Sequence, residues 1–128
     1  MSAQQPQVDQ DVLYQLLCNW AQSLPSKQIG TYTRLSQEYY AQTKVWIDPH
    51  YGWSAPLGEL NNHLHVKLPG SPPLSALVYN ESENEPGPGF WGSAPNVPPR
   101  PAQMQQAQAI WQGIVKQVIN FTWPARRP

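Results

Sequence analysis

Residues 72–92 read PPLSALVYNESENEPGPGFWG, and they contain the sharpest change of character in the chain. A nearly continuous apolar run from Leu74 to Tyr79 predicts a strand that is buried on both faces or packed under a helix. An acidic, polar turn follows, and a Pro-Gly-Pro-Gly element then ends on the adjacent aromatic residues Phe90 and Trp91. Prolines stiffen this corner, so it forms a recognition surface if the two rings are exposed and a lid on the core if they are buried.

Four helices are expected around this strand. Apolar stripes, caps and stop signals place the first helix at residues 9–24, and the second begins at Gly30 with Thr31 as its N-cap. The third runs from Ser54, its N-cap, to a stop at residues 68–70. The fourth runs from Pro101 to Asn120. On the last helix, Met104 begins the apolar stripe. The order helix, helix, helix, strand, helix predicts an α+β, mainly helical fold with about four helices and a small β element.

The length of 128 residues predicts one domain with a single modest core. Residues 1–8 have the composition of a disordered, Gln-rich tail, residues 9–123 form the predicted domain, and residues 124–128 form a basic C-terminal tail. Fifteen prolines, most of them in the second half, predict long and stiff irregular connections there.

Charge and hydropathy favour a cytoplasmic protein that makes no contact with membranes. Eight basic residues balance eight acidic ones, so the chain has no overall field to draw it to nucleic acid or to an anionic membrane. We find neither a secretory leader pattern nor an apolar window of membrane-spanning length. Any DNA binding would need a local patch, for which Arg126 and Arg127 beside Arg100 are the candidates.

The residues that could carry chemistry do not form a recognisable catalytic pattern. Cys18 lies on the first predicted helix without a neighbouring histidine, which favours an inert structural thiol. The histidines lack metal-ligand spacing, and no serine stands in a G-x-S-x-G motif. We therefore expect a protein that is not an enzyme and has no metal site and no cofactor.

The acidic turn likewise shows no pattern typical of a catalytic site. Glu81, Glu83 and Glu85 alternate in a predicted flexible loop, where each carboxylate should be solvated and have an ordinary pKa. The neighbouring prolines remove backbone N–H groups that a phosphate-binding loop would need.

Five aromatic residues fall in predicted loops rather than on helical stripes: Trp46, Tyr51, Trp53, Phe90 and Trp91. One interpretation is that they close the core over long irregular connections. The alternative is an aromatic pocket or partner surface, because rigid rings give a large contact area at low entropic cost.

Three motifs in this order resemble those of one family. Residues 30–36, GTYTRLS, are similar to a G-x-x-x-Y-x-x-L-A entry to a helix, with a shorter spacing between Gly and Tyr. Residues 57–62, LGELNN, are loosely similar to a V-G-x-A-x-x-x-N-P pattern in a recognition helix. Residues 73–79 and 87–90 take the place of a strand that leads into a Pro-Cys-His-Arg site and then a Gly-Gly-Tyr turn. From about residue 10 to residue 120 the chain resembles the winged-helix C-terminal domain of the O6-alkylguanine-DNA alkyltransferases and their alkyltransferase-like relatives.

The resemblance implies a winged-helix-like domain, but not the family's chemistry. Residues 78–81, VYNE, stand where the reactive cysteine and its histidine would be, and the family's DNA-wedging arginine falls near Ala55 or Pro56. Tyr32 matches the tyrosine that the family places against a DNA phosphate.

Three functional hypotheses follow, and together they name seven candidate binding residues: Tyr32 and Arg34 for DNA, and Trp53, Tyr79, Asn80, Phe90 and Trp91 for a small-ligand pocket. The first is a non-catalytic adaptor or inhibitory protein whose aromatic and proline-rich loops bind a protein partner; such small domains are typical of mobile elements and defence systems. The second is DNA binding, with further phosphate contacts from Lys44, Arg100, Arg126 and Arg127. The third is a pocket for a nucleotide-like ligand, in which Asn80 bonds a base edge while aromatic rings stack on it.

Overall fold

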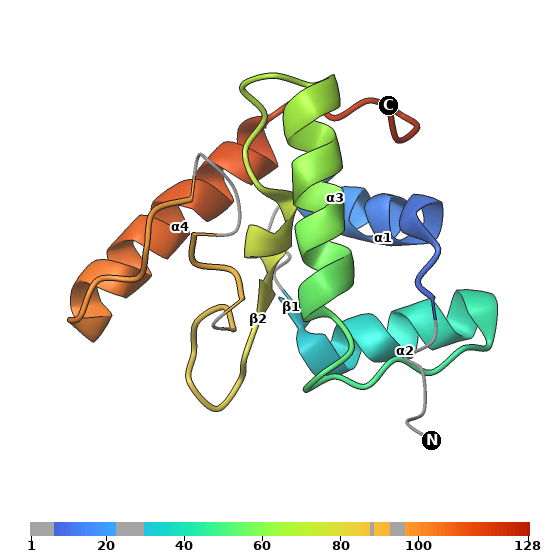
Figure 1. Ribbon diagram of the computed structural model, residues 1–128, viewed down its shortest axis with the longest axis horizontal. Helices are drawn as coiled ribbons and strands as arrows, with labels where there is room; N and C mark the ends of the chain where they lie inside the picture. The colour runs from blue at the N-terminus through green and yellow to red at the C-terminus, as the bar shows by residue number, and fades with distance from the viewer. Residues whose placement is uncertain (1–6, 23–29, 88, 93–96) are drawn as a thin grey trace.

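The computed structural model describes residues 7–22, 30–87, 89–92 and 97–128. In this part of the chain, the elements are α1 (Gln10–Gln22), β1 (Gly30–Thr31), α2 (Tyr32–Thr43), α3 (Ser54–Lys67), the 3-10 helix η1 (Leu74–Leu77), β2 (Val78–Tyr79) and α4 (Met104–Asn120) (Figure 1). The prediction of a small, mainly helical domain with four helices and a small β element is confirmed. Most of the predicted tail at residues 1–8 lies outside the described residues, although Val8 is buried.

The two strands form a short parallel sheet, with Gly30 opposite Val78 and Thr31 opposite Tyr79. The predicted strand from Leu74 to Tyr79 is therefore wrong over its first four residues, which form η1 instead. All of these residues are buried, as expected, but a buried apolar run has the same sequence pattern in a strand and in a tight helical turn. Because β1 has only two residues, only Val78 and Tyr79 find a strand to pair with.

Some of the predicted helix boundaries are confirmed, but the helix predicted from Pro101 begins at Met104, and the predicted end of the first helix at Leu24 lies outside the described residues. Thr31 is the N-cap of α2, since its hydroxyl oxygen accepts a hydrogen bond from the Arg34 N–H at 3.1 Å. The predicted cap of α3 is wrong by one residue, because Trp53 takes that position and Ser54 already lies in the helix. Met104 is also misassigned: its side chain is 52% exposed at the first turn of α4, before the apolar stripe reaches the core.

The core surrounds η1, which α1, α3 and α4 all contact. Leu74, Ala76 and Leu77 of η1 are fully buried there, and the Trp111 indole of α4 donates to the Ala76 carbonyl oxygen at 2.8 Å. In Figure 1, α3 stands beside the small sheet, with α4 on one side of the pair and α1 and α2 on the other. None of the helices in the described ranges is long and apolar enough to cross a membrane.

After α4 the chain packs against α1. The Tyr14 hydroxyl donates to the Pro124 carbonyl oxygen at 2.6 Å, and the Gln15 amide donates to the Ala125 carbonyl oxygen at 2.5 Å. Arg127 forms an ion pair with Asp11, with 2.7 Å between Nε and Oδ1. The basic residues 124–128 are thus attached along a helix.

Candidate functional site

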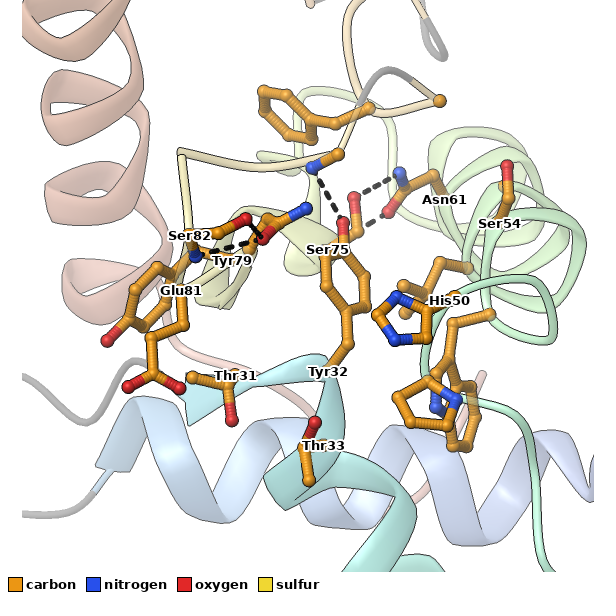
Figure 2. A pocket seen from close by; sticks show the side chains of 18 residues that line it. Thr31, Tyr32, Thr33, His50, Ser54, Asn61, Ser75, Tyr79, Glu81 and Ser82 are labelled. Atoms are coloured by element: carbon orange, nitrogen blue, oxygen red, sulfur yellow. Dashed lines mark hydrogen bonds between the residues drawn. The ribbon is translucent and has the colours of Figure 1, made fainter. Parts of the chain in front are cut away.

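A pocket of about 750 Å³ opens between the starts of α2 and α3 and the chain that leaves β2. Five of the seven predicted binding residues line it: Tyr32, Trp53, Tyr79, Asn80 and Phe90. Thr31, His50, Ser54, Asn61, Ser75, Glu81 and Ser82 also line it, and sequence reasoning did not select them. Figure 2 shows Tyr32 and Ser75 turned toward its centre, with His50 on one side of Tyr32 and Glu81 on the other in this view.

Trp53 forms a fixed apolar wall of the pocket. Its side chain is 1% exposed, and its indole N–H donates to the Ser36 hydroxyl at 2.8 Å. The Ser36 hydroxyl in turn donates to the Ile47 carbonyl oxygen at 2.5 Å, and the Tyr39 ring meets Trp53 edge-on at 5.5 Å between centroids. These contacts tie the loop between α2 and α3 to α2, so the tryptophan is held in one orientation.

Tyr32 points into the pocket, and its hydroxyl oxygen accepts the Gly87 backbone N–H at 2.9 Å. Burial raises the pKa of the phenol, while the bond from Gly87 lowers it in part, and the net effect keeps the group neutral. The DNA-phosphate role that the alkyltransferase resemblance implies for Tyr32 stays a prediction, since this hydroxyl faces the pocket and the Pro-Gly corner.

The Pro-Gly corner passes so close to α2 and α3 that it needs glycines. A Cβ atom on Gly87 would stand 3.0 Å from the Tyr32 hydroxyl oxygen, and one on Gly89 would collide with the Ser54 hydroxyl. Phe90 is buried and lines the pocket, whereas its neighbour Trp91 is half-buried and packs edge-on against the Phe90 ring at 5.3 Å. The corner is therefore both a wall of the pocket and a cover on the core. Pro88 lies outside the described residues.

Two amide side chains organise the polar part of the pocket. The Asn61 amide donates to the Ser75 hydroxyl at 2.7 Å, and both side chains are 4% exposed. The Asn80 carbonyl oxygen accepts from the Ser82 N–H at 3.1 Å and from the Ser82 hydroxyl at 2.8 Å (Figure 2). Asn61 could have been found from the sequence, because it is a polar residue on the stripe formed by Leu57, Leu60 and Leu64.

The prediction that the acidic turn is solvated is wrong for Glu85. Its side chain is buried, and Arg100 donates to both carboxylate oxygens, from Nε at 2.6 Å and from Nη2 at 3.0 Å. This bidentate pairing holds the pKa of Glu85 below its usual value. The pair joins the acidic turn to the proline-rich connector, and the Glu85 carbonyl oxygen also accepts the Asn80 N–H at 2.8 Å.

The residues predicted to contact DNA phosphates do not gather in one place. Arg34 and Lys44 belong to opposite ends of α2, and Arg34 is paired with Glu38 at 2.6 Å. Arg100 is paired with Glu85, Arg127 is paired with Asp11, and Arg126 is exposed beside it. Three of these five cations are thus already neutralised by carboxylates.

Two of the loop aromatics lie at the surface. Trp46 is 49% exposed and Tyr51 is 80% exposed, and the Tyr40 ring lies 6.4 Å from that of Trp46. Cys18 is buried beside Tyr14, and burial raises the pKa of its thiol to about 11, which agrees with the inert role expected for it. Within the described residues, no group of three or more His, Cys, Asp or Glu side chains could hold a metal ion.

Fold and site together define a small helical domain with one well-formed polar and aromatic pocket among its described residues. Comparison with protein-family models, with curated proteins and with solved structures finds no match for the chain.

Proposed function

We propose that this chain is a non-catalytic binding protein whose pocket takes a neutral, flat ring compound of nucleoside size. The observation that carries the proposal is the pocket of about 750 Å³ between α2, α3 and the corner at residues 85–90. That volume lies within the range of small-molecule sites, and its mixture of aromatic walls with a few convergent polar groups is typical of them. It corresponds to the third of the hypotheses drawn from the sequence.

The lining favours a neutral ligand. Among the described residues that line the pocket there is no lysine or arginine, so a phosphate would find no permanently charged cation there. Trp53, Tyr79 and Phe90 supply ring surfaces of the kind that stack on flat heterocycles. Binding without catalysis is favoured because the Ser75 and Ser82 hydroxyls are bonded to amide groups rather than to a histidine or a carboxylate.

The resemblance to the alkyltransferases adds support from the position of the pocket. The pocket lies where β2 ends at Tyr79 and the chain continues to Asn80, which is the place that the resemblance assigns to that family's reactive residue. We keep the winged-helix-like arrangement as part of this proposal.

A pair of glycine variants tests the proposal. Gly58 of α3 lines the pocket and Gly113 of α4 does not, and a Cβ atom at either would meet nothing within 4 Å. Gly58→Phe should fill the pocket, whereas Gly113→Phe makes the same change on a helix elsewhere. Both changes favour the helix, so both variants should fold.

The measurement is the rise in thermal unfolding midpoint with uridine, cytidine, inosine and adenosine, each at millimolar concentration. We expect at least one nucleoside to stabilise the wild type and Gly113→Phe, but not Gly58→Phe. If no nucleoside stabilises the wild type, the proposal is wrong.

A second candidate function is binding to a protein partner, which the exposed rings of Trp46 and Tyr51 favour. The test is affinity purification with the wild type, with the double variant Trp46→Ala/Tyr51→Ala and with Gly58→Phe, each after nuclease treatment. A partner that is lost only with the double variant supports this function. Equal recovery with all three proteins contradicts it.

A further inference from the structure

The Tyr32 hydroxyl has a fixed hydrogen-bond direction. The Gly87 backbone N–H, 2.9 Å away, can only donate, so the phenol oxygen is the acceptor in that bond. The proton of the phenol finds no acceptor in the part of the chain that the structure describes. Because the group is neutral, it keeps this proton and offers it to whatever occupies the pocket.

The Ser75 hydroxyl is arranged in the same way. The Ser75 N–H lies 3.4 Å from the Asn61 carbonyl oxygen, which turns the amide nitrogen of Asn61 toward the Ser75 hydroxyl at 2.7 Å. An amide nitrogen only donates, so the Ser75 oxygen accepts and its own proton is left over. Both side chains are more than nine-tenths buried and line the pocket.

Asn80 provides a third donor. Its side-chain carbonyl oxygen accepts from the Ser82 N–H, which again can only donate, and from the Ser82 hydroxyl. These two bonds fix the orientation of the amide, so the oxygen is engaged and the NH₂ group is the free end. The described residues provide no acceptor for this NH₂ group.

We infer that the pocket selects ring compounds that present carbonyl oxygens, such as uracil-like and hypoxanthine-like rings, over the corresponding amino-substituted rings. This inference rests on the proposed function and names its ligand class. The side-chain oxygens of Tyr32, Ser75 and Asn80 already accept hydrogen bonds within the protein, so three donor groups are left to face the pocket. A ligand must therefore present hydrogen-bond acceptors to them. A ring amine at the same position would set donor against donor and leave both groups without a partner.

Matched nucleoside pairs test the selectivity. Uridine and inosine carry a ring carbonyl where cytidine and adenosine carry an exocyclic amine, and the adjacent ring nitrogen is a donor in the first of each pair and an acceptor in the second. Dissociation constants are measured by isothermal titration calorimetry with the full chain. We expect uridine and inosine to bind at least about tenfold more tightly than cytidine and adenosine, which is the effect of one mismatched hydrogen bond.

Two variants locate the origin of the selectivity. Asn80→Asp keeps an oxygen for Ser82 and replaces the free NH₂ group by an acceptor, so it should erase or reverse the preference. Tyr32→Phe removes one donor and keeps the ring, and it should weaken uridine binding by about tenfold. Unfolding midpoints show that each variant is folded, and Tyr32→Phe still tests the inference if Asn80→Asp does not fold.

The outcomes separate the inference from the proposed function. The inference is supported if the wild type binds the carbonyl rings more tightly than the amino rings, and if Asn80→Asp erases this preference or Tyr32→Phe weakens the binding of uridine. Equal binding within both pairs, or tighter binding of the amino rings, overturns the inference but leaves the pocket as a binding site. If none of the four nucleosides binds the wild type, both the inference and the proposed function are overturned.

Discussion

Tyr14 and Tyr32 belong to two regions of the molecule whose polar groups are used in opposite ways. Where residues 121–128 pack against α1, the Tyr14 hydroxyl and the Gln15 amide donate to backbone carbonyl oxygens. In the pocket, the Tyr32 hydroxyl and the Thr31 hydroxyl accept from backbone N–H groups. Burial raises the pKa of each phenol above its ordinary value, so both tyrosines stay neutral well above neutral pH.

The difference shows how a fold makes a site without a catalytic motif. A buried donor that is paired inside the chain contributes to stability and has no further partner to seek. A buried hydroxyl that is held through its oxygen retains a proton that an acceptor outside the chain can take up. The polar groups beside α1 are therefore paired within the chain, whereas the Tyr32 hydroxyl keeps a proton that faces the pocket.

The largest expected effects come from the tryptophans of the two regions. Trp53 lines the pocket and Trp123 lies in the segment after α4; both are buried, and the Trp123 indole donates to the Val118 carbonyl oxygen at 2.9 Å. Each Trp→Ala variant should lose about 3–5 kcal/mol of unfolding free energy in urea titrations. Only Trp53→Ala should also weaken nucleoside binding, and equal weakening in both variants would contradict the distinction between the regions.

A smaller effect is expected from the two tyrosines themselves. Tyr14→Phe leaves the Pro124 carbonyl oxygen without its donor and should cost about 1–2 kcal/mol of unfolding free energy. Tyr32→Phe leaves the Gly87 N–H without its acceptor and should cost a similar amount. Calorimetric titration with uridine separates the two, because affinity should fall in Tyr32→Phe and stay unchanged in Tyr14→Phe.

The smallest effect is expected from the ion pair that supports the pocket corner. The pKa of Glu85 is lower in the folded chain than in the unfolded chain. The ionised carboxylate therefore stabilises the fold fully above about pH 4.5, and this stabilisation is lost as the pH falls through the pKa of Glu85 in the folded chain. Arg100→Gln should remove this lowering, so the variant is less stable at neutral pH and loses less stability on acidification. Urea unfolding at pH 7 and at pH 3 measures both changes, and parallel losses in wild type and variant would argue against the pairing.

Much of the fold could be predicted from local pattern. Thr31 begins α2 as expected, and the stripe of Leu57, Leu60 and Leu64 faces the core, because caps and apolar periodicity act within a few residues. Five of the seven candidate binding residues line one pocket, but the loop aromatics divide: Trp53 and Phe90 are buried at the pocket, whereas Trp46 and Tyr51 are exposed. The helical turn at Leu74 to Leu77 was missed because burial alone does not distinguish it from a strand.

The pairings within the site could not be predicted in the same way. Asn61 and Ser75 are fourteen residues apart, and Glu85 and Arg100 are fifteen apart, in different elements each time. Nothing in the local sequence indicates that these side chains meet, or which of two groups donates. The protein-partner and DNA hypotheses likewise depend on which rings and cations reach the surface.

By itself the sequence determined a small helical domain, the positions of its helices and a set of aromatic residues available to line a site. These properties depend on hydrophobic periodicity and backbone propensity, which are local. Only the tertiary structure decided that Gly87 and Gly89 lie against Tyr32 and Ser54, that Glu85 is buried against Arg100, and that polar groups from α2, η1 and the chain after β2 line one pocket. Those properties depend on contacts between segments that are distant in the sequence, which exist only after the chain has folded.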